Sequence, residues 1–184
     1  MEDGYLSEHW HDLYVMLGGS SAALLGLLFV ATSLHLNEIV NNPGYRIRAR
    51  NLTIHLVVTL VLAAAVLTPQ PIAVLGAELI AVCLGGLWLP LSFHYNAHFN
   101  NKAMGKRGGL SIYRGLTYVV GYLLGVAAGV ALVEQVNWGM YLLTLAYVIF
   151  IGSVVWNAWT IMVGVGQTEK TEESDQAVTG KARR

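Results

Sequence analysis

Long apolar runs, separated by short polar segments, dominate the chain. A helix needs about 20 mostly apolar residues to cross the hydrocarbon core of a bilayer, within a range of roughly 17–25. The runs that meet this requirement cover residues 13–36, 52–68, 72–93, 115–133 and 138–165. Because backbone polar groups in lipid must be hydrogen-bonded within their own segment, each run is predicted to be helical. The pattern therefore predicts an all-α bundle of five transmembrane helices over residues 13–165.

Hydrophilic segments flank this predicted bundle. Residues 1–12 form a short N-terminal tail, and residues 166–184 are polar, mixed in charge and without apolar periodicity. A segment of that composition cannot bury enough apolar surface to fold by itself. Residues 166–184 are therefore predicted to form a flexible cytoplasmic tail.

Helix-breaking residues mark the ends of the first two runs. Asn41-Asn42-Pro43-Gly44 follows the first run, and Pro69-Gln70-Pro71 follows the second. Proline lacks the backbone N–H that a helix interior needs. Residues 52–93 would begin and end on the same side of a membrane either as two spans or as a re-entrant hairpin. Length favours two spans, since a run of about 17 helical residues already covers about 25 Å.

The composition is that of a membrane protein. Hydrophobic residues make up 55% of the chain and charged residues only 12%, whereas soluble domains carry about 25% charged residues. This excludes an ordinary water-soluble globule, and the abundant apolar surface excludes a disordered chain. The 11 basic and 11 acidic residues balance to no net charge, so no nucleic-acid partner is predicted.

The distribution of Lys and Arg predicts the orientation. All 11 of these residues fall on one side of the five-span arrangement. Cytoplasmic loops carry an excess of Lys and Arg, so the N-terminus is predicted to lie outside and the C-terminus in the cytoplasm. Arg46, Arg48 and Arg50 would lie beside the membrane surface, where each basic side chain attracts anionic lipids by about 1 kcal/mol.

Small residues recur at helical spacing in two of the runs. The fourth run carries Gly121, Gly125 and Gly129, and the first run has a looser version in Gly18, Ala22 and Gly26. Such residues let two helix backbones approach closely in a membrane. This spacing fits packing within one bundle. The alternative is contact with a second copy or with another membrane protein.

Glu78 is the only Asp, Glu, Lys or Arg residue inside the five runs. It lies about 9 Å along the third run from its outer end. An acid at that depth is costly and usually faces a bundle interior or water. Ser20 and Ser21 are at a depth that could supply hydrogen bonds. Glu78 is predicted to be either a carboxyl that handles protons or cations, or a protonated packing residue.

A group of histidines lies toward the cytoplasmic ends of the first three runs. Its members, with one acidic neighbour, are His35, His55, His94, His98 and Glu38. Neutral imidazoles with a carboxylate suit zinc or non-haem iron, and two imidazoles can hold a haem. The alternative is that these histidines titrate at a wet interface without binding a ligand.

Four segments of the sequence carry a resemblance, namely His11 to Val15, Ala22 to Ala31, Arg46 to Arg50, and Pro69-Gln70. They are similar to segments of a family of small bacterial integral membrane proteins. The resemblance covers about the first 80 residues and implies a protein of the bacterial inner membrane. Some members of that family are labelled as modulators of the membrane-bound FtsH protease. The resemblance supplies no catalytic residues.

Three classes of function follow as predictions. The first is a homo-oligomeric ion or proton pathway that uses Glu78, Ser20 and Ser21. The second is a regulatory or scaffold subunit of another membrane protein, and the third is a haem- or metal-binding membrane protein. Because few residues lie outside the runs, the chain has no room for a soluble catalytic domain, and enzymatic activity is not expected.

Overall fold

The computed structural model describes residues 8–100, 108–136 and 138–182. The chain is 92% helical, and its described residues contain no strand, so the all-α prediction is confirmed. The helices in chain order are α1 (Glu8–Leu34), α2 (Leu36–Asn41), α3 (Pro43–Leu67), α4 (Ile72–Asn100), α5 (Gly108–Val133) and α6 (Gly139–Ala182).

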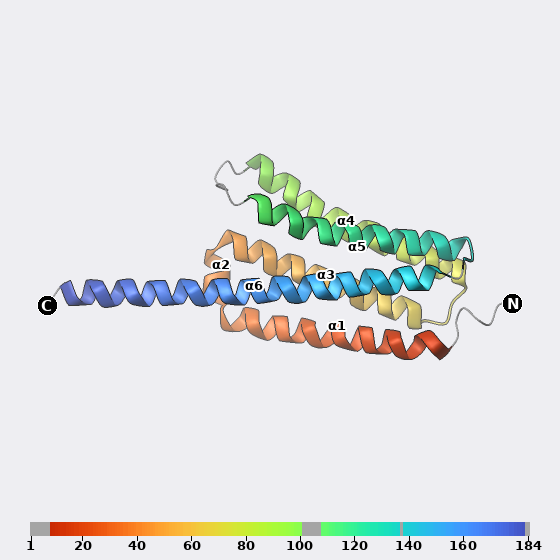
Figure 1. Cartoon of the computed structure of the whole chain (residues 1–184), viewed down its shortest axis with the longest axis horizontal. Helices are drawn as coiled ribbons and strands as arrows, with labels where there is room; N and C mark the ends of the chain where they lie inside the picture. The colour runs from red at the N-terminus through yellow and green to blue at the C-terminus, as the bar shows by residue number, and fades with distance from the viewer. Residues whose placement is uncertain (1–7, 101–107, 137, 183–184) are drawn as a thin grey trace.

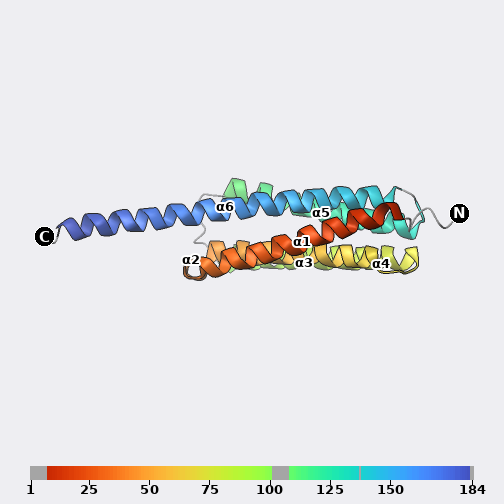
Figure 2. The same cartoon turned by 90° about the horizontal axis from the view of Figure 1, so that it is seen from below.

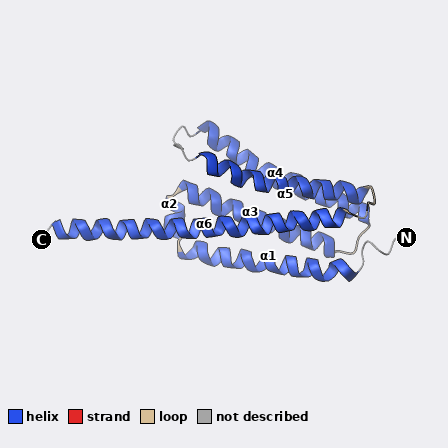
Figure 3. Cartoon of the chain, in the orientation of Figure 1, coloured by secondary structure: helices blue, strands red, loops and turns tan. Residues whose placement is uncertain are grey.

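The five long helices lie side by side and alternate in direction (Figure 1). α5 packs between α4 and α6, α1 packs on α3, and α3 also contacts α4 and α6. Figure 2 shows α5 and α6 in one layer and α3 and α4 in a second, and α1, which lies at the edge of the bundle in Figure 1, runs obliquely from the second layer toward the first. The secondary-structure view in Figure 3 shows how little chain connects these helices. Each long helix therefore reaches from one end of the bundle to the other.

Within the described residues, four helices are long and apolar enough to cross a membrane. They cover Trp10–Leu34, Gly44–Leu67, Leu116–Val133 and Gly139–Thr160, and α4 contributes a shorter apolar stretch, Ile72–Trp88. Only 22–39% of the residues in the four windows are buried inside the protein. Helices with apolar residues on every side, most of them facing outward, are suited to lipid and not to water. The chain therefore has the character of a multi-pass membrane protein.

The main core is built from aromatic and leucine side chains. Its largest fully buried members are Tyr14, Tyr122, Tyr147 and Phe150, together with leucines from α3, α4, α5 and α6. A smaller cluster around Leu52, Leu56 and Val154 lies beside it, where α1, α3 and α6 meet. Both clusters join segments distant in sequence, so the helices form one bundle.

Local signals explain where several helices begin and end. Asn42 caps α3 by accepting a hydrogen bond from the backbone N–H of Gly44 at 3.0 Å, and Pro43 occupies the first turn, where its missing N–H is not needed. At the end of α5, Gln135 adopts a left-handed conformation with φ 57°. The N–H of Val136 then bonds the carbonyl of Ala131 at 2.8 Å, which closes the helix in a Schellman motif.

The helices extend beyond the apolar runs that predict them. α3 begins at Pro43 and α4 continues through Pro90 to Asn100, because hydrogen bonding continues until a capping or turn signal stops it. α6 is a single helix of 44 residues. Residues 166–182, predicted to be a flexible tail, are helical in the structure. Their many Glu, Gln, Lys and Ala residues are good helix formers.

Candidate functional site

Glu78 lies in the second turn of α4, and its side chain is exposed on the outside of the bundle. Its Oε2 accepts a hydrogen bond from the Nε2 of Gln70 at 2.8 Å. Gln70 also donates to the carbonyl of Ala65 at the end of α3, at 3.1 Å. The Pro69-Gln70-Pro71 turn thus places the side-chain amide of Gln70 over the first turns of α4, where this amide is the hydrogen-bond partner of Glu78.

Ser20 and Ser21 do not join Glu78 in the structure. Ser20 donates to the carbonyl of Met16 at 2.8 Å, and Ser21 donates to that of Leu17 at 2.9 Å. Both hydroxyls are therefore used within α1, which packs against α3 and not along α4. Gln70 is the partner that the sequence analysis missed. The available signal was an amide flanked by two prolines, eight residues before the acid.

The outward face of α4 beside Glu78 is made of small side chains. Ala77, Ala81 and Gly85 follow each other at intervals of four residues, and all three are exposed. A Cβ atom added to Gly85 would meet nothing within 4 Å. This row, with Glu78 beside it, is an uncovered helix face that could accept another helix at close range.

The glycine row of α5 is used for contact within the chain. Gly129 and Gly76 bring the backbones of α5 and α4 together, since a Cβ on either would lie 2.7 Å from the other's carbonyl oxygen. A Cβ on Gly125 would overlap the Sγ of Cys83, and one on Gly121 would lie 2.7 Å from the ring of Phe150. The row therefore holds α5 close to α4 and α6.

The small residues of α1 divide between two environments. A Cβ on Gly18 would lie 3.0 Å from the Cβ of Ala63, so this glycine permits close packing of α1 on α3. Ala22 and Gly26 are exposed, and Gly26 has open space around it. Gly19 is exposed in the same way. The outward face of α1 is therefore a second uncovered row of small residues.

His55 is buried midway along α3 among aromatic rings. Its ring centroid lies 3.7 Å from that of Tyr118 and 5.5 Å from that of Tyr122. Its Nδ1 lies 2.5 Å from the carbonyl oxygen of Asn51. A carbonyl oxygen can only accept, so Nδ1 carries a proton. His55 is thus held in place by a backbone hydrogen bond and by the rings packed around it.

Buried polar atoms without a hydrogen-bond partner lie at and near this histidine. Among the described side chains, three buried atoms have no hydrogen-bond partner, namely Asn51 Oδ1, His55 Nε2 and Tyr122 Oη. Leaving one such group unsatisfied costs about 1–3 kcal/mol. Asn157 of α6 donates to Tyr118 Oη at 3.0 Å and so satisfies part of the same region. Apart from His55, these residues were not predicted as site residues.

The structure does not bring the described histidines into a metal centre. His35 lies near the end of α1 and lines a groove toward α6, whereas His55 faces the rings of α5. Within the described part of the chain, no three His, Cys, Asp or Glu side chains are grouped to hold a metal ion. The side chains of Glu38, His94 and His98 lie outside the described residues.

The three arginines lie near the start of α3, at the end of the bundle that carries α2 (Figure 1). Arg46, Arg48 and Arg50 are all exposed. Residues four apart share a helix face, so Arg46 and Arg50 lie on one side and Arg48 on another. The arrangement spreads positive charge around the first turns of α3.

Comparison of the chain with protein-family models, with curated proteins and with solved structures gave no match.

Proposed function

We propose that α1, α3, α4, α5 and α6 all cross the membrane, with the N-terminus outside and the C-terminus in the cytoplasm. Two observations support this. The five helices alternate in direction and are of similar reach in the bundle (Figure 1). The described basic residues Arg46, Arg114 and Lys170 belong to helix segments at one end, as the excess of Lys and Arg in the cytoplasm requires. The resemblance of the first 80 residues supports a place in the bacterial inner membrane.

Within that membrane, the chain assembles with further copies of itself through the outward face of α4. The observation that carries this proposal is the position of Glu78. A carboxyl within a span normally faces protein or water, yet Glu78 is exposed beside Ala77 and Ala81. A second copy packed on the small residues would cover the carboxyl. A symmetric dimer would also place two Glu78 side chains on one interface.

This interface is the proposed ion or proton pathway. The buried polar side chains of the described bundle interior are Ser21, His55, Thr59 and Asn157, and none is an acid. A route through one chain would therefore lack a carboxylate, whereas a route between chains would have Glu78. The acid would bind a proton or cation there, and Gln70 would orient it through the 2.8 Å hydrogen bond.

The pathway is tested with the purified full chain in liposomes carrying a pH gradient. Wild-type protein should dissipate the gradient, and Glu78→Gln should reduce the rate at least about tenfold, because the amide cannot ionise. Glu134→Gln is the control, since Glu134 is an exposed acid in the α5–α6 turn. Absence of wild-type flux, or equal flux from Glu78→Gln, would refute the pathway.

The assembly is tested separately from transport. Ala81→Cys in a Cys83→Ala background gives a chain whose single thiol lies on the proposed interface. Disulfides require Cα atoms about 4.4–6.8 Å apart, so oxidation should give a covalent dimer. Ala127→Cys, on an exposed position of α5, should stay monomeric. Equal cross-linking at both positions would contradict an interface on α4.

A second candidate function is a regulatory or scaffold subunit of another membrane protein. The observation that favours it is the outward face of α1, where Gly19 and Gly26 have open space around them. Small residues on a helix face permit close approach of a foreign helix. This candidate predicts a membrane protein that co-purifies in mild detergent and that Gly26→Leu displaces. Retention of the same partner by Gly26→Leu would count against it.

A further inference from the structure

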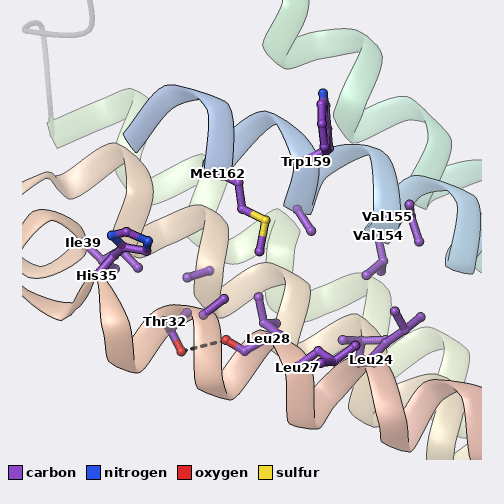
Figure 4. A pocket seen from close by; sticks show the side chains of 14 residues that line it. Leu24, Leu27, Leu28, Thr32, His35, Ile39, Val154, Val155, Trp159 and Met162 are labelled. Atoms are coloured by element: carbon purple, nitrogen blue, oxygen red, sulfur yellow. Dashed lines mark hydrogen bonds between the residues drawn. The ribbon is translucent and has the colours of Figure 1, made fainter. Parts of the chain in front are cut away.

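A groove runs between α1 and α6 in the half of the bundle next to α2 (Figure 4). Its volume is about 250 Å³. The walls are almost entirely apolar, and the polar members are Thr32 and His35. Thr32 uses its hydroxyl within α1, donating to the carbonyl of Leu28 at 2.9 Å. The groove therefore offers apolar surface along nearly its whole length.

The groove opens toward the surroundings of the bundle. Its floor is formed by buried side chains of α2 and α3, among them Ile39 and Leu56. Its edges are formed by strongly exposed side chains, with Leu27 of α1 66% exposed and Trp159 of α6 65% exposed. Outward-facing apolar edges of this kind would face lipid acyl chains in a bilayer. An acyl chain could enter from the side without crossing a polar barrier.

The size of the groove selects among possible occupants. Apolar cavities stay free of water, and an engineered cavity of about 150 Å³ is large enough to bind benzene. The groove is larger than that, so a segment of a hydrocarbon chain fits. A helix with its side chains is about 10–12 Å across and rises about 5.4 Å per turn, so one turn of a helix exceeds the volume of the groove. A slender apolar chain therefore suits this groove better than a protein helix.

One end of the groove is polar and the other is not. Figure 4 shows His35 and Ile39 at one end and Leu24 near the other. Ala49 of α3 also lines the groove, and the exposed Arg46 precedes it by three residues, which places both on one helix face. The positive charge of Arg46 thus lies one helical turn beyond the residues that line the groove, at the end next to α2. A charge at this position complements the negative charge of a phosphate.

We propose that this groove binds one acyl chain of an anionic phospholipid, with the headgroup phosphate beside Arg46. The proposal rests on the membrane placement inferred above, but not on the α4 interface or on Glu78. Loss of proton flux in Glu78→Gln therefore leaves it unaffected. A lipid held in this way would join α1, α3 and α6 at a place where protein packing between α1 and α6 is sparse.

The test is native mass spectrometry of the full chain after removal of bound lipid. Phosphatidylglycerol and phosphatidylcholine of identical acyl chains are added back in equal amounts. Wild-type protein should bind one lipid per chain and prefer phosphatidylglycerol about fivefold, since one basic residue near the surface contributes about 1 kcal/mol. Arg46→Gln should abolish the preference while a lipid remains bound.

Filling the groove provides the second arm. Ala31→Trp places an indole in the groove, and Ala127→Trp places one on an exposed face of α5 as the matched control. Lipid binding should fall at least about tenfold in Ala31→Trp and stay unchanged in Ala127→Trp. Circular dichroism and gel filtration check that both variants fold.

Three results would overturn the proposal. The first is equal lipid binding by Ala31→Trp and Ala127→Trp when both are folded. The second is no preference for phosphatidylglycerol in the wild type. The third is a lipid-free wild-type dimer that Ala31→Trp dissociates, which would identify a second copy as the occupant. If Ala31→Trp fails to fold, Ala31→Phe is used, and unchanged lipid binding in this variant would equally contradict the proposal.

Discussion

At the scale of single residues, the closest contacts of the bundle depend on the absence of a side chain. Gly125 faces Cys83 and Gly121 faces Phe150, so each of these two glycines of α5 meets a larger group on a neighbouring helix. The glycine spacing predicts close approach from the sequence alone. It could not predict the partner, because Cys83 and Phe150 lie in apolar runs where every position is compatible with a contact.

The pair of Gly125 and Cys83 gives a prediction of stability. Gly125→Ala should lower the free energy of unfolding by about 1–3 kcal/mol, because overpacking forces α4 and α5 to shift. Adding Cys83→Ala should restore most of the loss, since it removes the Sγ atom that the new methyl group overlaps. The measurement is reversible unfolding in mixed micelles with increasing dodecyl sulfate.

Gly152→Ala is the control, because a Cβ at that position of α6 meets nothing within 4 Å. It should leave stability unchanged or raise it slightly, as alanine is the better helix former. If Gly125→Ala is neutral, or if Cys83→Ala fails to rescue it, the contact does not limit the packing of α4 and α5.

At the scale of elements, polar side chains tie α6 to its neighbours. The hydroxyl of Tyr147 donates to the backbone carbonyl of Thr59 in α3, and Asn157 donates to Tyr118 of α5. Near the N-terminal end of α6, the hydroxyls of Tyr14 and Thr144 lie 3.3 Å apart and so link α1 to α6. The presence of these helices could be predicted from the length of the apolar runs. Their hydrogen bonds could not be predicted, because a tyrosine in such a run is equally compatible with a place in the aromatic belt at the membrane surface.

Tyr147→Phe should destabilise the bundle by about 0.5–1.5 kcal/mol, because it removes one buried hydrogen bond and keeps the ring. Tyr14→Phe should cost less, since the contacts of its hydroxyl are long, at 3.3 Å to the hydroxyl of Thr144 and 3.5 Å to the carbonyl of Met140. The same micelle unfolding experiment compares the two variants. A larger loss of unfolding free energy for Tyr14→Phe would show that the hydroxyl of Tyr14 makes the stronger contact.

At the scale of the whole molecule, the helix arrangement was more predictable than the candidate site. The apolar runs and their breakers predict helices at nearly the right places, and tight turns force neighbours to run antiparallel. The direction in which the Glu78 side chain points depends on which side of α4 packs on α5 and α3. That is set by contacts such as Gly76 with Gly129, which the sequence of α4 does not specify.

The five-span arrangement predicts the accessibility of single cysteines. In a Cys83→Ala background, Glu134→Cys in the α5–α6 turn should react with a membrane-impermeant maleimide in intact cells. Asn41→Cys at the end of α2 should react only after the membrane is permeabilised. Both native residues are exposed. Protection of Glu134→Cys in intact cells would contradict the proposed arrangement, because either a helix before it does not cross or the whole bundle has the opposite orientation.

The length of α6 has an electrostatic consequence. The helix has 44 residues, and Figure 1 shows its C-terminal part projecting past the other helices. Residues 166–182 extend about 25 Å at 1.5 Å per residue, whereas the Debye length at physiological salt is about 8 Å. In a membrane, the last turn of α6 would therefore lie beyond the distance over which lipid headgroups act on a charge. Charges at the far end of α6 would act on aqueous molecules alone.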